Sequence, residues 1–176
     1  MALDMHTASV PIFVRMLGNL VTWLDKAEAH ATARKFESAV YLTARLAPDM
    51  LALPTQIQIA CDAAKFCIAR LAGSEAPAFA DDEKSLADLR QRVQKTIDYL
   101  KSVPAAQIAG SDAKEISVPR RAGPITMTGE SYLKYFALPN FFFHVTTTYA
   151  LLRHNGVELG KTDFLGALPL AGADAG

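Results

Sequence analysis

The residues of this sequence that most resemble parts of a chemical site are its histidines, and His144 stands out among them. It lies on the same face of a predicted helix as Phe141, Val145 and Thr148, and that face is expected to pack inward. A buried imidazole needs partners for its ring nitrogens, and it can also bind a metal ion or accept a proton. We therefore expect a polar pocket around His144, which is also the candidate metal ligand.

Other polar side chains are candidates for the same pocket. Asn140 lies one helical turn before His144 and Thr148 one turn after it, so both project from the same side of that helix. A second predicted helix offers Gln58 and Asp62. An acid–base site that joins His144 to Asp62 or Tyr149 is one interpretation of this set.

The remaining histidines and the cysteines have structural explanations. His6 and His30 lie at the ends of the first predicted helix, where exposure or a bond to a backbone carbonyl accounts for them. A protonated His154 in the last turn of the final helix would complement the helix dipole. Cys61 and Cys67 are separated by roughly 9 Å along one helix, too far for a disulfide. We expect free, buried thiols, which suit a reducing cytoplasm.

The spacing of apolar residues predicts the helices that must position these side chains. Steps of three and four predict helices over about residues 7–31, 54–73, 82–102 and 129–155, the last bent or restarted at Pro139. Ser9 is expected to cap the first of them through its side chain. Residues 41–49 are expected to form a short helical turn or a packed loop.

A different pattern precedes the last helix. Ile116 and Val118 alternate with polar neighbours, as do Ile125 and Met127 after the turn, which predicts a short β-hairpin. The pair Arg120 and Arg121 then lies at a solvated turn. Because each apolar stripe must be covered by another, we expect an all-α fold, an up-down four-helix bundle with this hairpin inserted before the last helix.

The length, composition and charge of the chain argue against several classes of function. The 176 residues fit a single domain over residues 1–166, followed by a flexible tail over residues 167–176. Lys+Arg 18 against Asp+Glu 18 leaves no cationic surplus, so we expect no nucleic-acid partner. The most apolar stretch is interrupted by polar residues, and no basic leader precedes it, so we expect neither a membrane span nor a secretory signal.

Three segments carry a resemblance to a known family. They are Ala8-Ser9-Val10-Pro11 with Arg15, then Ala44-Arg45-Leu46-Ala47-Pro48-Asp49-Met50, and Leu138-Pro139-Asn140-Phe141-Phe142-Phe143-His144-Val145-Thr146-Thr147-Thr148-Tyr149 with Leu152-Arg153-His154-Asn155-Gly156. Together with the order of the helices, they resemble an uncharacterised domain-of-unknown-function family of the DinB/YfiT-like superfamily. The resemblance covers roughly residues 5–166.

That resemblance implies a metal site, and the residues at the expected ligand positions of this sequence can be compared with the ligands of the superfamily. In the superfamily one histidine of the second helix and a His-x-x-x-His pair of the last helix hold nickel or zinc, and some members are thiol transferases or thiol-dependent isomerases. Here the partner position of His144 holds Thr148 or Asn140, and the second helix offers Cys61 beside Gln58 and Asp62. One imidazole with such neighbours binds zinc or nickel less tightly than three imidazoles.

Two functions follow from these residues. The first is a small-ligand-binding or interaction protein with a polar pocket around His144 and no certain cofactor. The second is a divalent-metal-dependent transferase or hydrolase, similar to the thiol transferases, in which His144, Asp62 and Asn140 hold zinc or nickel. The resemblance and the many apolar positions also lead us to expect a homodimer.

Overall fold

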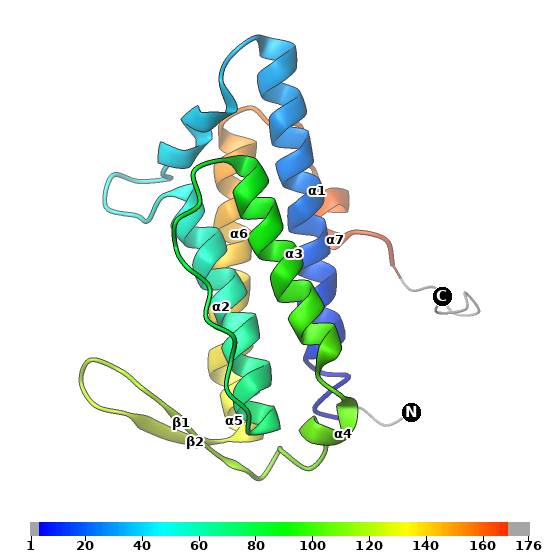
Figure 1. The fold of residues 1–176 in the computed structure, drawn as a ribbon. Helices are drawn as coiled ribbons and strands as arrows, with labels where there is room; N and C mark the ends of the chain where they lie inside the picture. Colours follow the sequence, from blue (N-terminus) through cyan, green and yellow to red (C-terminus); the bar gives the residue numbers. More distant parts are fainter. Residues whose placement is uncertain (1–3, 169–176) are drawn as a thin grey trace.

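Four long helices form the body of the molecule. The computed structural model describes residues 4–168, and its long helices are α1 (Val10–Arg34), α2 (Leu53–Ala72), α3 (Leu86–Ser102) and α6 (Leu138–His154). They lie side by side in one bundle, with the only two-stranded sheet of the described residues at its lower end (Figure 1). The predicted helical bundle with a hairpin before its last helix is confirmed.

The direction of the helices follows from contacts between them. Near the start of α2, Gln58 donates to Glu83, which lies just before α3, at 2.8 Å. Further along both helices, Asp62 of α2 pairs with Arg92 of α3 at 3.4 Å. The helices α2 and α3 therefore run in the same direction instead of alternating as the expected up-down order implies, and residues 73–85 return along the length of the bundle between them (Figure 1).

The core lies where the apolar stripes of the four helices meet. Phe13 of α1 and Phe141 of α6 pack edge to face, with ring centroids 4.8 Å apart. Each fully buried side chain of this size contributes about 1.5–3 kcal/mol relative to an exposed one. The largest side chains in this core are Trp23, Tyr41, Tyr132, Phe13, Phe141, Leu17, Leu20, Leu24, Leu53, Ile57, Ile68 and Leu71.

Two helix starts differ from the predictions. The first helix begins at Val10 rather than at residue 7, and the Ser9 hydroxyl does not cap it but donates to the Met5 carbonyl at 2.6 Å. The third helix begins at Leu86 rather than at Asp82, because the Ser85 hydroxyl accepts a hydrogen bond from the Asp88 amide at 3.0 Å. Ser85 thus satisfies an amide that the first turn leaves unpaired.

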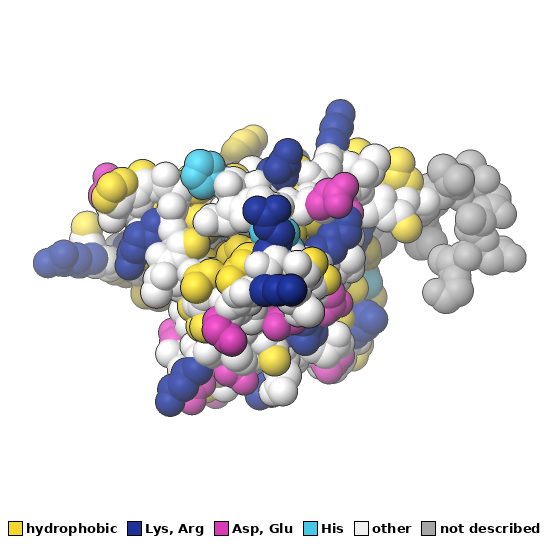
Figure 2. All heavy atoms as spheres, turned by 90° about the horizontal axis from the view of Figure 1, so that it is seen from above, with side chains coloured by type: hydrophobic (Ala, Val, Ile, Leu, Met, Phe, Trp, Pro, Cys, Tyr) yellow, Lys and Arg dark blue, Asp and Glu magenta, His cyan; other side chains and the backbone are white. Residues whose placement is uncertain are grey.

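Short elements connect the long helices. The 3-10 helix η1 (Ser38–Thr43) follows α1 and overlaps the start of the 41–49 segment that was expected to form a short helical turn or a packed loop. Val40, Leu46 and Leu51 are exposed in η1 and the segment after it. Seen from this end of the bundle, hydrophobic side chains lie between Lys and Arg side chains near the centre of the surface (Figure 2).

The hairpin lies at the opposite end. After α4 (Ala105–Ile108), the strands β1 (Glu115–Val118) and β2 (Ile125–Thr128) pair antiparallel with Ser117 opposite Thr126. Arg120 and Arg121 are exposed in the connecting loop, so the predicted solvated turn is confirmed.

One glycine links the hairpin to the last helical region. A Cβ atom at Gly129 would lie 1.9 Å from the Ser111 carbonyl oxygen, so only glycine fits there. The Gly129 amide donates to the Lys114 carbonyl at 2.8 Å, which ties the end of β2 to the segment before β1.

The helical region after β2 passes through a π turn. It consists of α5 (Gly129–Tyr132), the π-helical turn η2 (Leu133–Ala137) and then α6. The Leu138 amide donates to the Leu133 carbonyl, five residues back, and Pro139 follows in the first turn of α6. Proline cannot continue an α-helix without losing a hydrogen bond and meeting the carbonyl four residues before it, and the wider turn accommodates it. The dihedral angles stay helical at Tyr132, Ala137 and Leu138, so the helix continues through the π turn and does not restart at Pro139.

The end of the described chain packs against α1. In α7 (Lys161–Leu165), the Asp163 carbonyl accepts from the Trp23 indole at 3.1 Å, and the Phe164 ring stacks on Trp23. Arg15, one of the residues of the family resemblance, donates to the Leu165 carbonyl at 3.1 Å. Residues 169–176 of the predicted flexible tail lie outside the described residues. No helix between residues 4 and 168 combines the length and apolar character that a bilayer crossing needs.

Candidate functional site

His144 is buried between α6 and α2, as predicted, but its partner was not predicted. Its exposed fraction is 8%. The ring Nδ1 lies 2.7 Å from the Gln56 amide oxygen, at the start of α2. The helix-two partners expected from the sequence, Gln58 and Asp62, do not contact His144; Gln56 does.

The contacts of Gln56 fix which nitrogen of His144 carries the proton. The Gln56 amide nitrogen donates to the Leu51 carbonyl at 3.1 Å, so the oxygen of this amide faces the imidazole. Because that oxygen only accepts, Nδ1 of His144 must donate. In the neutral ring, Nε2 then keeps its lone pair, and it has no hydrogen-bond partner among residues 4–168. Burial lowers the pKa of His144 below its usual 6.5, which favours this neutral form.

The threonines beside His144 are occupied within their own helix. The Thr148 hydroxyl donates to the His144 carbonyl at 2.9 Å, and the Thr147 hydroxyl donates to the Phe143 carbonyl at 2.8 Å. Such bonds to the preceding turn satisfy a buried hydroxyl without another side chain. Thr148 is therefore buried next to His144, as expected, but it does not turn toward the ring.

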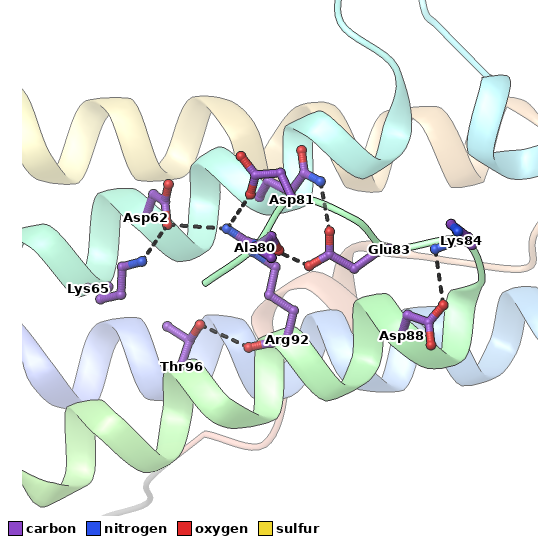
Figure 3. A network of polar contacts seen from close by, with 10 residues as sticks. Asp62, Lys65, Ala80, Asp81, Glu83, Lys84, Asp88, Arg92 and Thr96 are labelled. Carbon is purple, nitrogen blue, oxygen red and sulfur yellow. Dashed lines mark hydrogen bonds and ion pairs between the residues drawn. The ribbon is translucent and has the colours of Figure 1, made fainter. Parts of the chain in front are cut away.

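Gln58 and Asp62 belong to a second polar cluster, centred on Arg92 of α3 (Figure 3). The buried Arg92 guanidinium pairs with Glu83 and Asp81 at 2.8 Å each and with Asp62 at 3.4 Å. It also donates to the Ala80 carbonyl at 2.9 Å. Arg92 thus fastens the 73–85 connection to the bundle, and three carboxylates surround its charge.

Two further contacts complete this Arg92 cluster. Burial alone would raise the pKa of Glu83, but hydrogen bonds from Arg92 and Gln58 outweigh it and hold the pKa of this carboxyl below its usual value. Lys65, almost fully buried, pairs with Asp62 at 2.9 Å and lies over the Phe79 ring at 4.4 Å. The cluster is therefore an ion-paired network, in which Arg92 Nε has no hydrogen-bond partner among the described residues, and it suits a structural role better than proton transfer.

Tyr149 and His30 lie apart from both clusters. The Tyr149 ring packs edge to face against Trp23, and its hydroxyl donates to the Leu159 carbonyl at 3.4 Å, so the expected acid–base pairing with His144 is not formed. One expectation for His30 was a bond to a backbone carbonyl, and it is wrong. Nδ1 of His30 lies 2.6 Å from the Tyr41 hydroxyl instead. The carbonyl was the wrong partner because η1 folds back and brings Tyr41 against α1.

The cysteines are free and buried, as predicted. Burial raises the pKa of the Cys61 thiol to about 11, and burial also raises the pKa of Cys67. A thiol that stays protonated is a poor nucleophile. Neither cysteine is therefore a candidate for the thiol chemistry known in the wider superfamily.

A groove between α2 and the π turn collects two of the predicted pocket residues. Its volume is about 220 Å³, and Asp62 and Asn140 both line it. Asn140 lies one helical turn before His144, but His144 itself does not line this groove. The residues that line this groove, called the α2–α6 groove below, are Ile59, Asp62, Ala63, Phe66, Arg70, Val118, Pro119, Tyr132, Phe136, Ala137 and Asn140.

The donors around His144 do not fit a zinc or nickel centre. Nδ1 of His144 is bonded to Gln56, the nearby threonines bond to their own helix, and Asp62 pairs with Lys65 and Arg92. Zinc and nickel sites in proteins use several imidazole, thiolate or carboxylate ligands. Within the described part of the chain, no three His, Cys, Asp or Glu side chains are grouped so that they could hold a metal ion.

Comparison with known proteins gives the family. The model of the family described as "Domain of unknown function (DUF1993)" matches residues 5–165. The chain belongs to the DUF1993 family. A DinB family member protein from Shewanella denitrificans, whose crystal structure was solved at 1.83 Å resolution, is 45% identical to this DUF1993 protein. The match covers 94% of each chain with a TM-score of 0.89. No curated protein matches.

Three polar residues that shape these sites were missed in the sequence. Gln56 lies three residues after the buried Leu53 and four before the buried Ala60, so its place on the apolar stripe was visible. Arg92 lies in the same way three residues after the buried Leu89. Arg70 had no such signal, because its hydrogen-bond partner Tyr132 lies 62 positions away along the chain.

Proposed function

We propose that this DUF1993 protein binds a small organic molecule in the α2–α6 groove and does so without a zinc or nickel centre. The observation that carries the proposal is the groove itself, a cavity of about 220 Å³ that brings Asn140, Arg70 and Tyr132 together with aromatic side chains. Ligand sites combine apolar walls with a few polar groups that fix the orientation of the ligand. A volume of this size suits a molecule smaller than a typical drug.

Two features of the groove support ligand binding rather than a structural role. The Asn140 side chain forms no hydrogen bond within residues 4–168, although it is half-buried. The groove also borders η2, and π turns often occur at functional sites.

A fragment screen by protein-observed NMR tests the proposal. Small aromatic fragments that are neutral, anionic or cationic are added to the ¹⁵N-labelled chain. We expect at least one charge class to shift the amide signals of Asp62 and of residues 136–138 and 140, while those of residues 120–123 in the exposed loop stay in place. Ala63→Leu, which fills the groove, should abolish the shifts, whereas Ala87→Leu on the exposed face of α3 should not. Shifts that survive Ala63→Leu would place the ligand elsewhere.

The alternative is a metal-dependent transferase or hydrolase, and the same preparation distinguishes it. The chain is purified without a metal-affinity step, and its zinc and nickel contents are measured. We expect less than one ion per chain, with no change in His144→Ala. One zinc or nickel ion per chain that is lost in His144→Ala would replace our proposal with the metal-dependent alternative.

A further inference from the structure

Arg70 is a half-buried cation without a counter-ion. Its guanidinium lies near the rings of Phe66 and Tyr132, with the central carbon 5.3 Å and 5.7 Å from the two ring centroids. Nη1 donates to the Tyr132 hydroxyl at 2.9 Å, and Arg70 forms no ion pair in the part of the chain that the structure describes. The contrast with Arg92, which three carboxylates surround, is sharp.

The one carboxylate in the groove does not neutralise Arg70. Asp62 pairs with Lys65 at 2.9 Å and with Arg92 at 3.4 Å, both on the side of the bundle that faces α3. A partly desolvated guanidinium that lacks such a partner keeps its attraction for an anion. Only Nη1 of the guanidinium donates to a described side chain, so the other N–H groups along its edge remain for that contact.

Two further donors surround the same space. The Tyr132 hydroxyl accepts from Arg70, so its own proton is free to be donated. Burial raises the pKa of Tyr132 to about 12, and the hydroxyl therefore keeps that proton at neutral pH. Asn140 adds an amide from α6, and Phe66 and Phe136 supply apolar surface beside these groups.

We propose, on the basis of the function proposed above, that the α2–α6 groove takes a small organic monocarboxylate. The carboxylate lies against the edge of the Arg70 guanidinium, where two parallel N–H groups match its two oxygens. The apolar body of the ligand lies against Phe66 and Phe136. Tyr132 and Asn140 donate to the carboxylate oxygens that Arg70 leaves unsatisfied.

Benzoate and benzamide form a matched pair of probes, because they share one shape and differ in charge. Each is titrated into the ¹⁵N-labelled chain, and dissociation constants are taken from the shifts of residues 136–138 and 140. We expect benzoate to bind at least about tenfold more tightly than benzamide, as one charge-assisted bidentate contact implies. Arg70→Gln should weaken benzoate about tenfold or more, whereas Arg121→Gln, which removes a charge from the exposed loop, should leave it unchanged.

A second variant guards against loss of the fold. Arg70→Lys keeps the charge but not the planar pair of donors, and it should bind benzoate with an affinity between those of the parent chain and Arg70→Gln. Equal losses in Arg70→Gln and Arg121→Gln would mean that only net charge matters, which overturns the inference.

The remaining outcomes separate this inference from the proposed function. If benzamide, or a neutral or cationic fragment, occupies the groove as tightly as benzoate, the carboxylate class is wrong and the binding function stands. If no fragment of any charge shifts the groove signals, both proposals fail.

Discussion

The hydrogen bond between Gln56 and His144 gives the sharpest test of the structure. In Gln56→Leu, the Nδ1–H of a ring that is 8% exposed loses its acceptor. Leaving such a donor unpaired in the interior costs about 1–3 kcal/mol. The other partner of Gln56, the Leu51 carbonyl, belongs to an exposed residue and can bond to water at little cost. We therefore expect a loss of about 2 kcal/mol in the free energy of unfolding.

That loss is large enough to measure in a chain of this length. For a domain of 150–250 residues, 1 kcal/mol corresponds to about 2–4 °C in Tm, so Gln56→Leu should lower Tm by about 4–8 °C. Urea denaturation should show the same loss at an unchanged m value. Gln91→Leu, at an exposed position of α3, is the matched control and should change Tm little.

A double mutant isolates the pair from its surroundings. His144→Leu alone leaves the Gln56 oxygen unpaired, whereas the double variant removes both polar partners and can be nearly neutral. We expect the double variant to lose less stability than the sum of the two single variants by about 1–2 kcal/mol. The reasoning fails if the single losses simply add, or if ¹⁵N NMR of the imidazole places the proton on Nε2.

Three further predictions concern other parts of the molecule. Gly129→Ala should cost about 1–3 kcal/mol in thermal denaturation, because the new Cβ meets the Ser111 carbonyl oxygen; an unchanged Tm would contradict the close approach. Because burial lowers the pKa of His144 from its usual 6.5, the unfolded chain takes up this proton first, and stability should be complete above that pH and fall as the pH drops through the folded-state pKa. Urea midpoints from about pH 8 to about pH 5 should show that decline, and it should flatten in His144→Gln. The homodimer expected from the sequence remains a prediction: sedimentation should show a dimer that Phe143→Asp weakens, since Tyr135 and Phe143 are 77% and 57% exposed, and a monomer at micromolar concentration would refute it.

The four helices could be predicted because each buries a continuous apolar stripe. The period of the stripe predicts that these helices exist, but not the residue at which each begins. The Ser85 cap sets the start of the third helix, whereas the first helix begins at Val10 without a side-chain cap. The parallel course of α2 and α3 also had a signal in the sequence. Residues 73–85 can span roughly 40 Å when extended, and α2 is only about 30 Å long. The connection is therefore long enough to return along the whole bundle.

Less of the candidate site than of the fold could be predicted from the sequence. Burial of His144 could be predicted from its place on an apolar face, and it is confirmed. Its partner could not be chosen among the polar residues of α2. Gln56 and Gln58 differ by only two positions, and the rotation of α2 about its own axis relative to α6 decides which of them faces His144. Arg70 and Tyr132 meet through tertiary packing alone, which no local pattern encodes.

The π turn before α6 makes the number of residues in this segment matter. Each residue of an α-helix turns the chain by about 100°, and a π turn holds about one residue more than an α turn. Deleting one residue from Leu133–Ala137 would let an ordinary helix run from Gly129 into α6, and it would rotate Tyr132 by about 100° away from Arg70. A relative that is one residue shorter between β2 and α6 would keep the bundle and lose this corner of the groove.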